Sequence, residues 1–120
     1  PILDARAKQV YTCAKLNSKD GSHAIVEPCA IALQSLLEKI KNYNKLYFCG
    51  DGVPVYKEYI ASIIPNAQFS DTSNISPHLL INSALKNINN ALPYNKILPI
   101  YLRAPQAERM LLEGKLKTNG

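Results

Sequence analysis

The spacing of apolar residues changes once along the chain, near Pro28, and this change most constrains the fold. Across residues 9–16 apolar and polar side chains alternate, which is the period of a half-buried β-strand. Beyond Pro28 the apolar residues follow the i, i+3, i+4, i+7 spacing of an amphipathic helix: Leu33, Leu36, Leu37 and Ile40. The chain is therefore predicted to begin with strands and to continue with helices.

Two short links divide the first 28 residues into three predicted strands. Residues 2–5 form the first, and the link 6–8 joins it to the strand at 9–16. The stretch 17–22, with Asp-Gly at its centre, has the composition of a tight turn. Residues 23–28 supply a third strand, which we expect to end at its proline. An antiparallel meander follows from this order.

The middle of the chain is predicted to alternate strands with helices. The apolar run 45–50 is typical of a buried strand. Residues 51–65 predict a helix with Pro54 in its first turn, and residues 67–70 predict a short strand. The inner stripe expected for this helix is Tyr56, Tyr59, Ile60 and Ile63.

The last third is predicted to hold two more helices and an extended segment between them. Ser76 before a proline marks a helix start, and residues 87–95 read as a loop. Residues 97–103 are extended and apolar, so alternate side chains should face the core, Leu102 among them as a buried residue. Residues 104–114 predict a last short helix, and the end of the chain beyond them should be frayed.

The predicted order is β-β-β-α-β-α-β-α, which defines an α/β fold class. It implies a mixed sheet of about five strands with helices against its faces. This order matches the ribonuclease H-like unit, which also builds each lobe of the actin-like ATPase and sugar-kinase superfamily. We expect residues 1–104 to form one such lobe of a two-lobed protein and residues 105–120 to form a C-terminal helix and tail. An N-terminal lobe would then be absent, as the first residue, Pro1, also suggests.

Composition narrows the class of protein. The net charge of +5 and pI near 9.2 permit contact with nucleic acid without requiring it. Three widely spaced cysteines without a Cys-x-x-Cys pair argue against a disulfide framework and a zinc site. No apolar run approaches the roughly 20 residues of a membrane span, and no signal peptide is visible. We therefore expect a cytoplasmic protein without membrane contact.

The first hairpin lacks the residues that nucleotide or metal chemistry requires. A phosphate-binding hairpin needs glycine or small hydroxyl residues so that backbone N–H groups can approach the phosphates. Here Asp4 is followed by Ala-Arg-Ala-Lys. A two-metal nuclease needs several converging carboxylates, and only Asp4, Glu27 and Asp51 stand at strand ends. We therefore assign no catalytic residue and no metal, and expect Asp4 to bond hairpin amides or to pair with Arg6.

Two further features are weak candidates. Gly50 and Gly52 lie at a strand-to-helix corner that could seat a nucleotide at a helix N-terminus or could simply form a tight turn. His23 and His78 are far apart and lack any metal-binding spacing. The candidates for a cofactor site are therefore Asp4, Gly50 and Gly52, with the structural interpretation left open beside the functional one.

Two end motifs resemble one protein family. The opening "ILDARAKQVYTCAKL" and the closing "PIYLRAPQAERMLLEG" resemble the second lobe of the TsaB (YeaZ) family, the non-catalytic partner in bacterial threonylcarbamoyladenosine synthesis on tRNA. That lobe begins with an Asp-Ala-Arg hairpin and then Val-Tyr, here Asp4, Ala5, Arg6, Val10 and Tyr11. It ends with Pro-x-Tyr-Leu-Arg and then Ala-Glu, here Pro99, Tyr101, Leu102, Arg103, Ala107 and Glu108. The Gly50-Asp51-Gly52 corner fits the family's Gly-x-Gly turn. The family's first lobe, with its Asp-Thr-Ser strand, has no counterpart.

The resemblance implies a scaffold subunit that supports a catalytic subunit, TsaD, together with a TsaE-like ATPase, and that meets tRNA indirectly. ATP and magnesium would belong to those partners, so this chain would hold no cofactor and would be inactive alone. A homodimer is compatible with it. The partner-binding candidates are the polar and aromatic residues of the closing motif: Tyr101, Arg103, Gln106, Glu108 and Arg109. Arg103 could instead pair with Glu108.

Two alternatives remain open. One is a fragment of a sugar-kinase-like or glycoprotease-like enzyme, which the missing hairpin glycine disfavours. The other is a basic nucleic-acid-binding module, which rests on the net charge alone.

Overall fold

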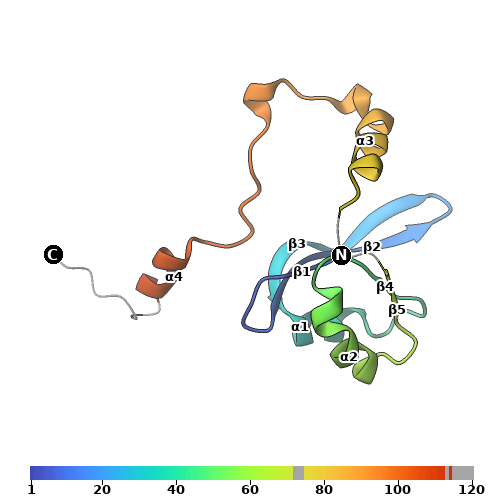
Figure 1. The fold of residues 1–120 in the computed structure, drawn as a ribbon, viewed down its shortest axis with the longest axis vertical. Helices are drawn as coiled ribbons and strands as arrows, with labels where there is room; N and C mark the ends of the chain where they lie inside the picture. Colours follow the sequence, from blue (N-terminus) through green and yellow to red (C-terminus); the bar gives the residue numbers. More distant parts are fainter. Residues whose placement is uncertain (72–74, 113, 115–120) are drawn as a thin grey trace.

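Three antiparallel strands form the first sheet, in the order β1-β2-β3. They are β1 (Ile2–Asp4), β2 (Gln9–Ser18) and β3 (Gly21–Ala32), as a computed structural model shows for residues 1–71, 75–112 and 114. β2 pairs with β1 from Val10 to Thr12 and with β3 along most of its length. The predicted meander is confirmed (Figure 1).

β3 does not end at Pro28, as the sequence suggested, but continues to Ala32. Between the pairs Thr12↔Cys29 and Ala14↔Val26 the register shifts, so β3 carries one extra residue at its proline. β3 is also the edge strand of its sheet. A proline at a bulge on an edge strand breaks no ladder hydrogen bond, which explains why the strand passes through it.

The second sheet is small and separate. β4 (Tyr47–Phe48) and β5 (Gln68–Phe69) pair in parallel. The expected single sheet of about five strands is therefore wrong in size: the structure is mixed α/β with one three-stranded antiparallel and one two-stranded parallel sheet. The two sheets meet where the backbone N–H of Ile2 donates to the carbonyl oxygen of Cys49 at 2.8 Å. Ile2 O also accepts the N–H of Gly52 at 3.1 Å, but Cys49 and Gly52 both lie beyond the end of β4, so the two sheets remain separate.

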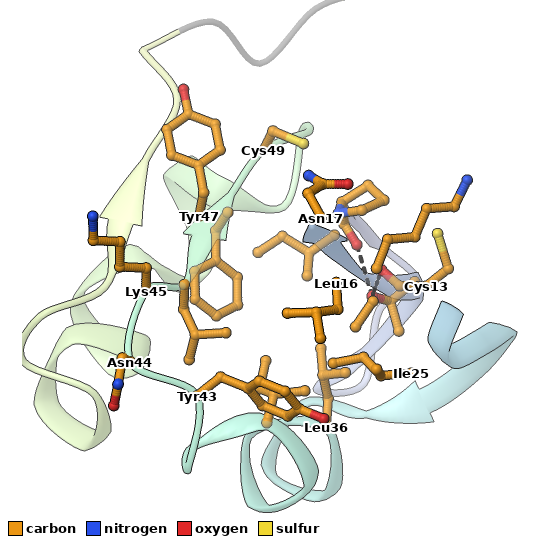
Figure 2. Close-up of a pocket in the computed structure, with 18 residues that line it drawn as sticks. Cys13, Leu16, Asn17, Ile25, Leu36, Tyr43, Asn44, Lys45, Tyr47 and Cys49 are labelled. Atoms are coloured by element: carbon orange, nitrogen blue, oxygen red, sulfur yellow. Dashed lines mark hydrogen bonds between the residues drawn. The ribbon is translucent and has the colours of Figure 1, made fainter. Parts of the chain in front are cut away.

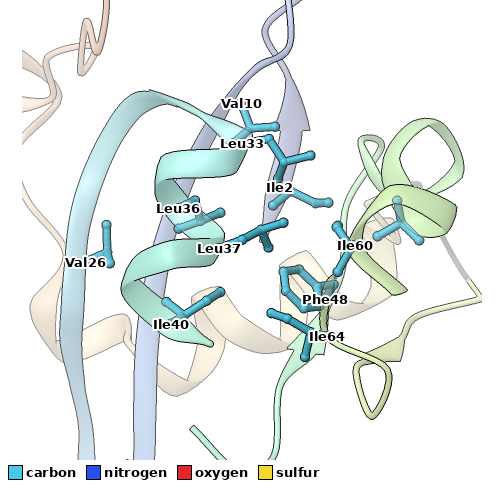
Figure 3. Close-up of a cluster of buried hydrophobic side chains, with 11 residues drawn as sticks. Ile2, Val10, Val26, Leu33, Leu36, Leu37, Ile40, Phe48, Ile60 and Ile64 are labelled. Atoms are coloured by element: carbon cyan, nitrogen blue, oxygen red, sulfur yellow. The ribbon is translucent and has the colours of Figure 1, made fainter. Parts of the chain in front are cut away.

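Two helices pack on one apolar cluster with the strands. The predicted helix is confirmed as α1 (Leu33–Ile40), and all four of its predicted apolar residues are buried. Figure 3 shows its side chains pointing toward those of β4 and of α2 (Val53–Ile63). The cluster consists of Ile2, Val10, Val26, Leu33, Leu36, Leu37, Ile40, Phe48, Val53, Ile60 and Ile64. Each fully buried aliphatic side chain contributes roughly 1.5–3 kcal/mol to folding, so this cluster is what holds the body together.

The inner stripe predicted for α2 is only partly correct. Ile60 is fully buried and Tyr56 packs against the cluster. Tyr59 and Ile63 are instead exposed, whereas Val53 at the start of the helix is buried. The side of α2 that faces the cluster therefore runs through Val53, Tyr56 and Ile60.

The rest of the chain forms an arm outside the body (Figure 1). The helix α3 (Pro77–Lys86) follows Ser76, which has the extended backbone of an N-cap but forms no capping bond through its side chain. Two short 3-10 turns, η1 (Ile88–Asn90) and η2 (Tyr94–Lys96), occupy the predicted loop. The last helix is α4 (Gln106–Leu112), and Gly114 beyond it has a φ of +67°. Residues 115–120, predicted to be frayed, lie outside the described residues.

Candidate functional site

The bend between β1 and β2 adopts a left-handed backbone without glycine. Arg6, Ala7 and Lys8 have φ angles of +61°, +50° and +59°. For residues with a Cβ this conformation costs roughly 1–2 kcal/mol each. Ala5 N donates to Gln9 O at 3.0 Å, and the bend is thereby held closed. The sequence showed that the bend contains no glycine, but it did not show that Arg6, Ala7 and Lys8 would adopt the positive φ angles that glycine favours.

Asp4 is engaged by two donors. Its Oδ1 accepts a hydrogen bond from the backbone N–H of Arg6 at 2.9 Å and from the hydroxyl of Tyr56 at 2.8 Å. The Tyr56 hydroxyl first, and then the Arg6 amide, hold the pKa of Asp4 below its ordinary value of 3.8. The same bond raises the pKa of Tyr56 above 10.0. The expectation that Asp4 bonds hairpin amides is confirmed for Arg6, and Tyr56 is an additional partner that sequence spacing did not reveal.

A second carboxylate lies beside Asp4. The Oδ1 of Asp51 accepts the backbone N–H of Asp4 at 3.1 Å, across 47 positions of sequence. The sequence placed Asp51 at a strand end but did not show that it lies beside Asp4, because nothing in the local pattern shows that the corner before α2 folds against β1. Among the described residues no group of three or more His, Cys, Asp or Glu side chains could hold a metal. The contact between the two aspartates joins the backbone N–H of Asp4 to the side chain of Asp51.

Gly50 and Gly52 form the contact between this corner and β1. A Cβ on Gly50 would lie 2.5 Å from the carbonyl oxygen of Ile2, and one on Gly52 would lie 3.0 Å from it. Gly52 N donates to that same oxygen at 3.1 Å. Gly50 also has a φ of +105°, which side chains rarely adopt. Close approach of two backbones therefore accounts for both glycines, and the Ile2 carbonyl occupies the space over the corner.

The two histidines singled out by sequence do not join this corner. His23 lies exposed on β3, paired with Leu16 of β2, and His78 lies exposed in α3. Glu27, the third carboxylate considered for metal chemistry, is exposed on β3. The structure thus brings together Asp4, Asp51 and Tyr56.

Arg103 connects the arm to the hairpin. Its Nη1 donates to the carbonyl oxygen of Ala5 at 3.0 Å in a partly buried position. This is a different partner from Glu108, which is exposed. The nearby Arg109 donates from Nε to Ala104 O at 3.2 Å, within the arm. An arginine fork can satisfy a carbonyl that a strand end leaves free, so Arg103 acts here as a link between distant parts of the chain.

The arm crosses the face of the first sheet that points away from the main cluster. Beside Arg103 a shallow pocket of about 300 Å³ is lined by Leu3, Tyr11, Ile100, Tyr101, Leu102 and Arg103. The predicted alternation of buried and outward side chains in 97–103 is wrong: Ile100 is 80% exposed and Leu102 is only half-buried. The segment lies over the sheet without pairing into it. Of the other partner-binding candidates, Tyr101 is 84% exposed and Gln106 is the first residue of α4.

The arm carries an extensive apolar surface. The helix α3 contains three leucines and one isoleucine, and none of its residues is buried. The exposed large apolar residues of the arm are Ile75, Leu79, Leu80, Ile81, Leu85, Ile88, Leu92, Tyr94, Ile97, Leu98, Ile100, Tyr101, Leu111 and Leu112. So many exposed large apolar side chains on one segment favour a contact with another molecule or domain. The spacing of Ile81, Ala84, Leu85 and Ile88 is that of a helix with one apolar face, and the described residues leave that face uncovered.

Comparison with known proteins adds no assignment. No profile of a known protein family matches the chain, and no curated protein matches it. In the part of the chain that the structure describes, every helix is too short or too polar to cross a bilayer.

Proposed function

We propose that this chain is a non-catalytic scaffold subunit of a cytoplasmic complex that makes threonylcarbamoyladenosine on tRNA, corresponding to the C-terminal lobe of a TsaB-like protein. In this proposal it supports a TsaD-like catalytic subunit. ATP and magnesium are bound by TsaD-like and TsaE-like partners, and tRNA is met through them. The end motifs, through Asp4 and Arg103, are what connect the chain to that family.

The arrangement of strands supports a ribonuclease H-like lobe. The antiparallel order β1-β2-β3 places β1 at an edge, and β1 touches the residue after β4 through Ile2 N to Cys49 O. β4 in turn pairs with β5 in parallel. The strands thus succeed one another in space as β3-β2-β1-β4-β5, with three antiparallel strands at one side and parallel ones at the other. That succession is expected of the proposed lobe, although the ladder is interrupted.

The uncovered apolar surface of the arm is the observation that carries the proposal. A scaffold acts through surface that stays exposed until its partner binds, and Leu79, Ile81 and Leu85 are 66%, 58% and 62% exposed. The first hairpin also supports the proposal that the subunit is non-catalytic. Its aspartate is occupied by Arg6 and Tyr56, and the Ile2 carbonyl lies over the glycine corner.

A binding experiment with a TsaD-like subunit tests the proposal. Isothermal calorimetry of the 120-residue chain against that subunit should give saturable binding. Leu85→Asp should weaken it at least about tenfold, because a charge at the centre of an apolar contact costs more than 1.4 kcal/mol. Val55→Asp in α2 of the body is the matched control, because Val55 is 60% exposed and the substitution also replaces an apolar side chain by aspartate; it should leave binding within about twofold. Failure of the chain to bind at all would contradict the proposal.

A tRNA titration separates this function from a nucleic-acid-binding module. The scaffold proposal expects tRNA to bind the isolated chain weakly. Tight binding, whose log affinity falls steeply with log salt concentration, would instead identify the +5 charge as the functional feature.

A further inference from the structure

Two pockets beside the first sheet differ in where their tyrosines come from. The larger, of about 890 Å³, opens between residues 12–17 of β2 and the segment 43–49, and both of its tyrosines belong to that segment (Figure 2). The smaller, of about 300 Å³, lies between the sheet and the arm, with Tyr11 from β2 and Tyr101 from the arm. The smaller pocket is therefore the one placed to hold a flat ring between aromatic side chains from two different parts of the chain.

The size and walls of the smaller pocket suit a single ring system. Small-molecule sites span roughly 300–1,000 Å³, so this pocket has room for a group the size of one nucleobase. Its aliphatic walls are Leu3, Ile100 and Leu102. The ring of Tyr101 is 84% exposed, so no described part of the chain covers it. An aromatic face that is open beside aliphatic walls favours a flat ligand that stacks.

Arg103 adds a positive charge to the pocket. Its bond to Ala5 O uses one of the five N–H groups of the guanidinium, and it forms no ion pair with a carboxylate of the described residues. No carboxylate is among the described residues that line the pocket. Asp4, which follows Leu3 in β1, is bonded instead to Tyr56 of α2. The remaining N–H groups of Arg103 can therefore bind an anion, and their planar arrangement matches a phosphate.

The bend that follows Ala5 supplies further positive charge. Arg6 and Lys8 are both exposed, and neither forms an ion pair with a described residue. The Tyr56 hydroxyl and the Arg6 amide lower the pKa of Asp4 more than the charge of Arg6 does, so the Arg6 side chain is only weakly engaged. The bend also keeps positive φ angles without glycine. Backbone strain of this kind is concentrated at functional sites.

Aromatic side chains beside a group of cations are the features that bind an unstacked nucleotide. In single-stranded nucleic acids the splayed base stacks on tyrosine rings or on arginine guanidinium planes, and the phosphates pair with arginine and lysine. The net charge of +5 attracts such a polyanion to the chain as a whole.

We propose that the smaller pocket binds one unstacked nucleotide of a single-stranded nucleic acid. The base lies against Tyr11 and Tyr101, and the phosphates beside it meet Arg103, Arg6 and Lys8. This site goes beyond the function proposed above, in which tRNA is met through partner subunits. It does not rest on that function, because the isolated chain carries every residue of the site.

A site for one nucleotide should bind weakly and with a shallow salt dependence. Each phosphate contact in a single strand contributes about −0.7 to the slope of log affinity against log salt concentration, so three cations give about −2. We expect a dissociation constant between about 10 μM and 1 mM at low salt. Such weak binding agrees with the scaffold proposal, and failure to observe it would leave that proposal standing.

Fluorescence anisotropy of the 120-residue chain with 5′-fluorescein oligonucleotides tests the site. Five linked uridines should bind saturably in the stated range. An abasic oligonucleotide with the same number of phosphates should bind at least about fivefold more weakly, because it loses base stacking. Five linked deoxyuridines separate the two sources of the ligand. Equal binding would show that base and phosphate are bound in RNA and DNA alike, whereas weaker binding of the DNA would show that the 2′-hydroxyl is bound as well.

Variants locate the binding. Tyr101→Ala should weaken binding of the uridine probe at least about fivefold, whereas Tyr101→Phe, which keeps the ring, should stay within about twofold. Tyr94→Ala is the matched control, because Tyr94 is 91% exposed on the same arm and does not line the pocket. Lys8→Gln should make the salt slope shallower by about 0.7, and Lys96→Gln in η2 should leave it unchanged. Thermal melting confirms that each variant folds.

Three results would overturn the proposal. The first is the absence of saturable binding below about 1 mM. The second is equal binding of the abasic probe, which would show that charge alone is recognised. The third is an equal loss of affinity in Tyr94→Ala and Tyr101→Ala, which would place the contact elsewhere on the arm.

Discussion

The guanidinium of Arg103 donates to the carbonyl oxygen of Ala5, which lies 98 positions earlier in the chain. This bond joins the two motifs at the ends of the sequence into one local structure. Arg103 follows the extended part of the arm, and Ala5 begins the left-handed bend after β1. The hydrogen bond is therefore the main polar attachment described between the arm and the first sheet.

Arg103→Ala should detach the arm without unfolding the body. A hydrogen bond from a charged donor contributes at least about 1.5 kcal/mol, and we take this lower value because the site is only partly buried. Loss of the bond should therefore shift the equilibrium between attached and detached arm about tenfold toward detachment. Chymotrypsin should then cleave after Tyr101, which is exposed, about tenfold faster. Arg109→Ala is the matched control because its bond to Ala104 stays within the arm. Equal cleavage rates in the two variants would show that Arg103 does not hold the arm.

Gly50→Ala should destabilise the body more than Gly21→Ala does. Both glycines have positive φ, +105° and +131°, so both substitutions carry backbone strain of about 1–3 kcal/mol. Only at Gly50 would the new Cβ also lie 2.5 Å from the Ile2 carbonyl, whereas nothing lies within 4 Å at Gly21. Urea denaturation of the two variants measures the difference. Equal losses of stability would contradict the close approach of the corner to β1.

Tyr56→Phe should make the stability of the protein less sensitive to acid. In the wild type the Tyr56 hydroxyl holds the pKa of Asp4 below 3.8, so ionised Asp4 stabilises the folded state above that value. This contribution is lost as the pH falls through the folded pKa. The variant lacks most of it, so the two proteins should differ at neutral pH and converge at low pH. Carbon-detected NMR titration of the Asp4 carboxyl should show the pKa rising in the variant.

The alkaline limb gives a second check on the same bond. The hydrogen bond to Asp4 raises the pKa of Tyr56 above 10.0, and its stabilising effect is lost as the pH rises through the folded value. Ultraviolet titration of tyrosinate absorbance should show a delayed component whose midpoint lies above 10.0. Asp4→Asn should abolish that delay, and a delay that persists in this variant would assign it to a different tyrosine.

Leu36→Ala and Leu79→Ala should differ by several kcal/mol. Leu36 is 1% exposed within the main cluster, and truncation of such a leucine costs about 2–5 kcal/mol. Leu79 is 66% exposed in α3, so its truncation should change the free energy of unfolding by less than about 0.5 kcal/mol. Chemical denaturation compares them. A large loss for Leu79→Ala in the isolated chain would show that α3 packs on the body.

Local pattern was enough to place most of the elements. The alternation in 9–16 and the helical spacing of Leu33 and Ile40 each come from which side of an element faces the core, and both predictions are confirmed. Pro54 and Pro77 marked the first turns of two helices correctly, because proline has no N–H to lose there. Such signals depend only on neighbours within a few residues.

The spacing of apolar residues failed to predict burial where burial depends on which other part of the chain packs against the segment. The spacing of α2 indicated that Tyr59 and Ile63 face inward, but no described part of the chain covers them and both are exposed. The spacing in 97–103 indicated burial for Ile100, and that segment lies over the sheet with Ile100 exposed. An apolar period shows that a face could be buried; it does not show that a surface exists to bury it.

The sequence by itself determined the order of strands and helices, the apolar residues of α1 and the absence of glycine from the first bend. It did so because propensity and periodicity act over one or two turns. Only the tertiary structure decided that Asp4 meets Tyr56 and Asp51, that Arg103 reaches Ala5, and that a groove opens beside β2. These contacts join residues tens of positions apart, and their formation depends on how the chain closes in space.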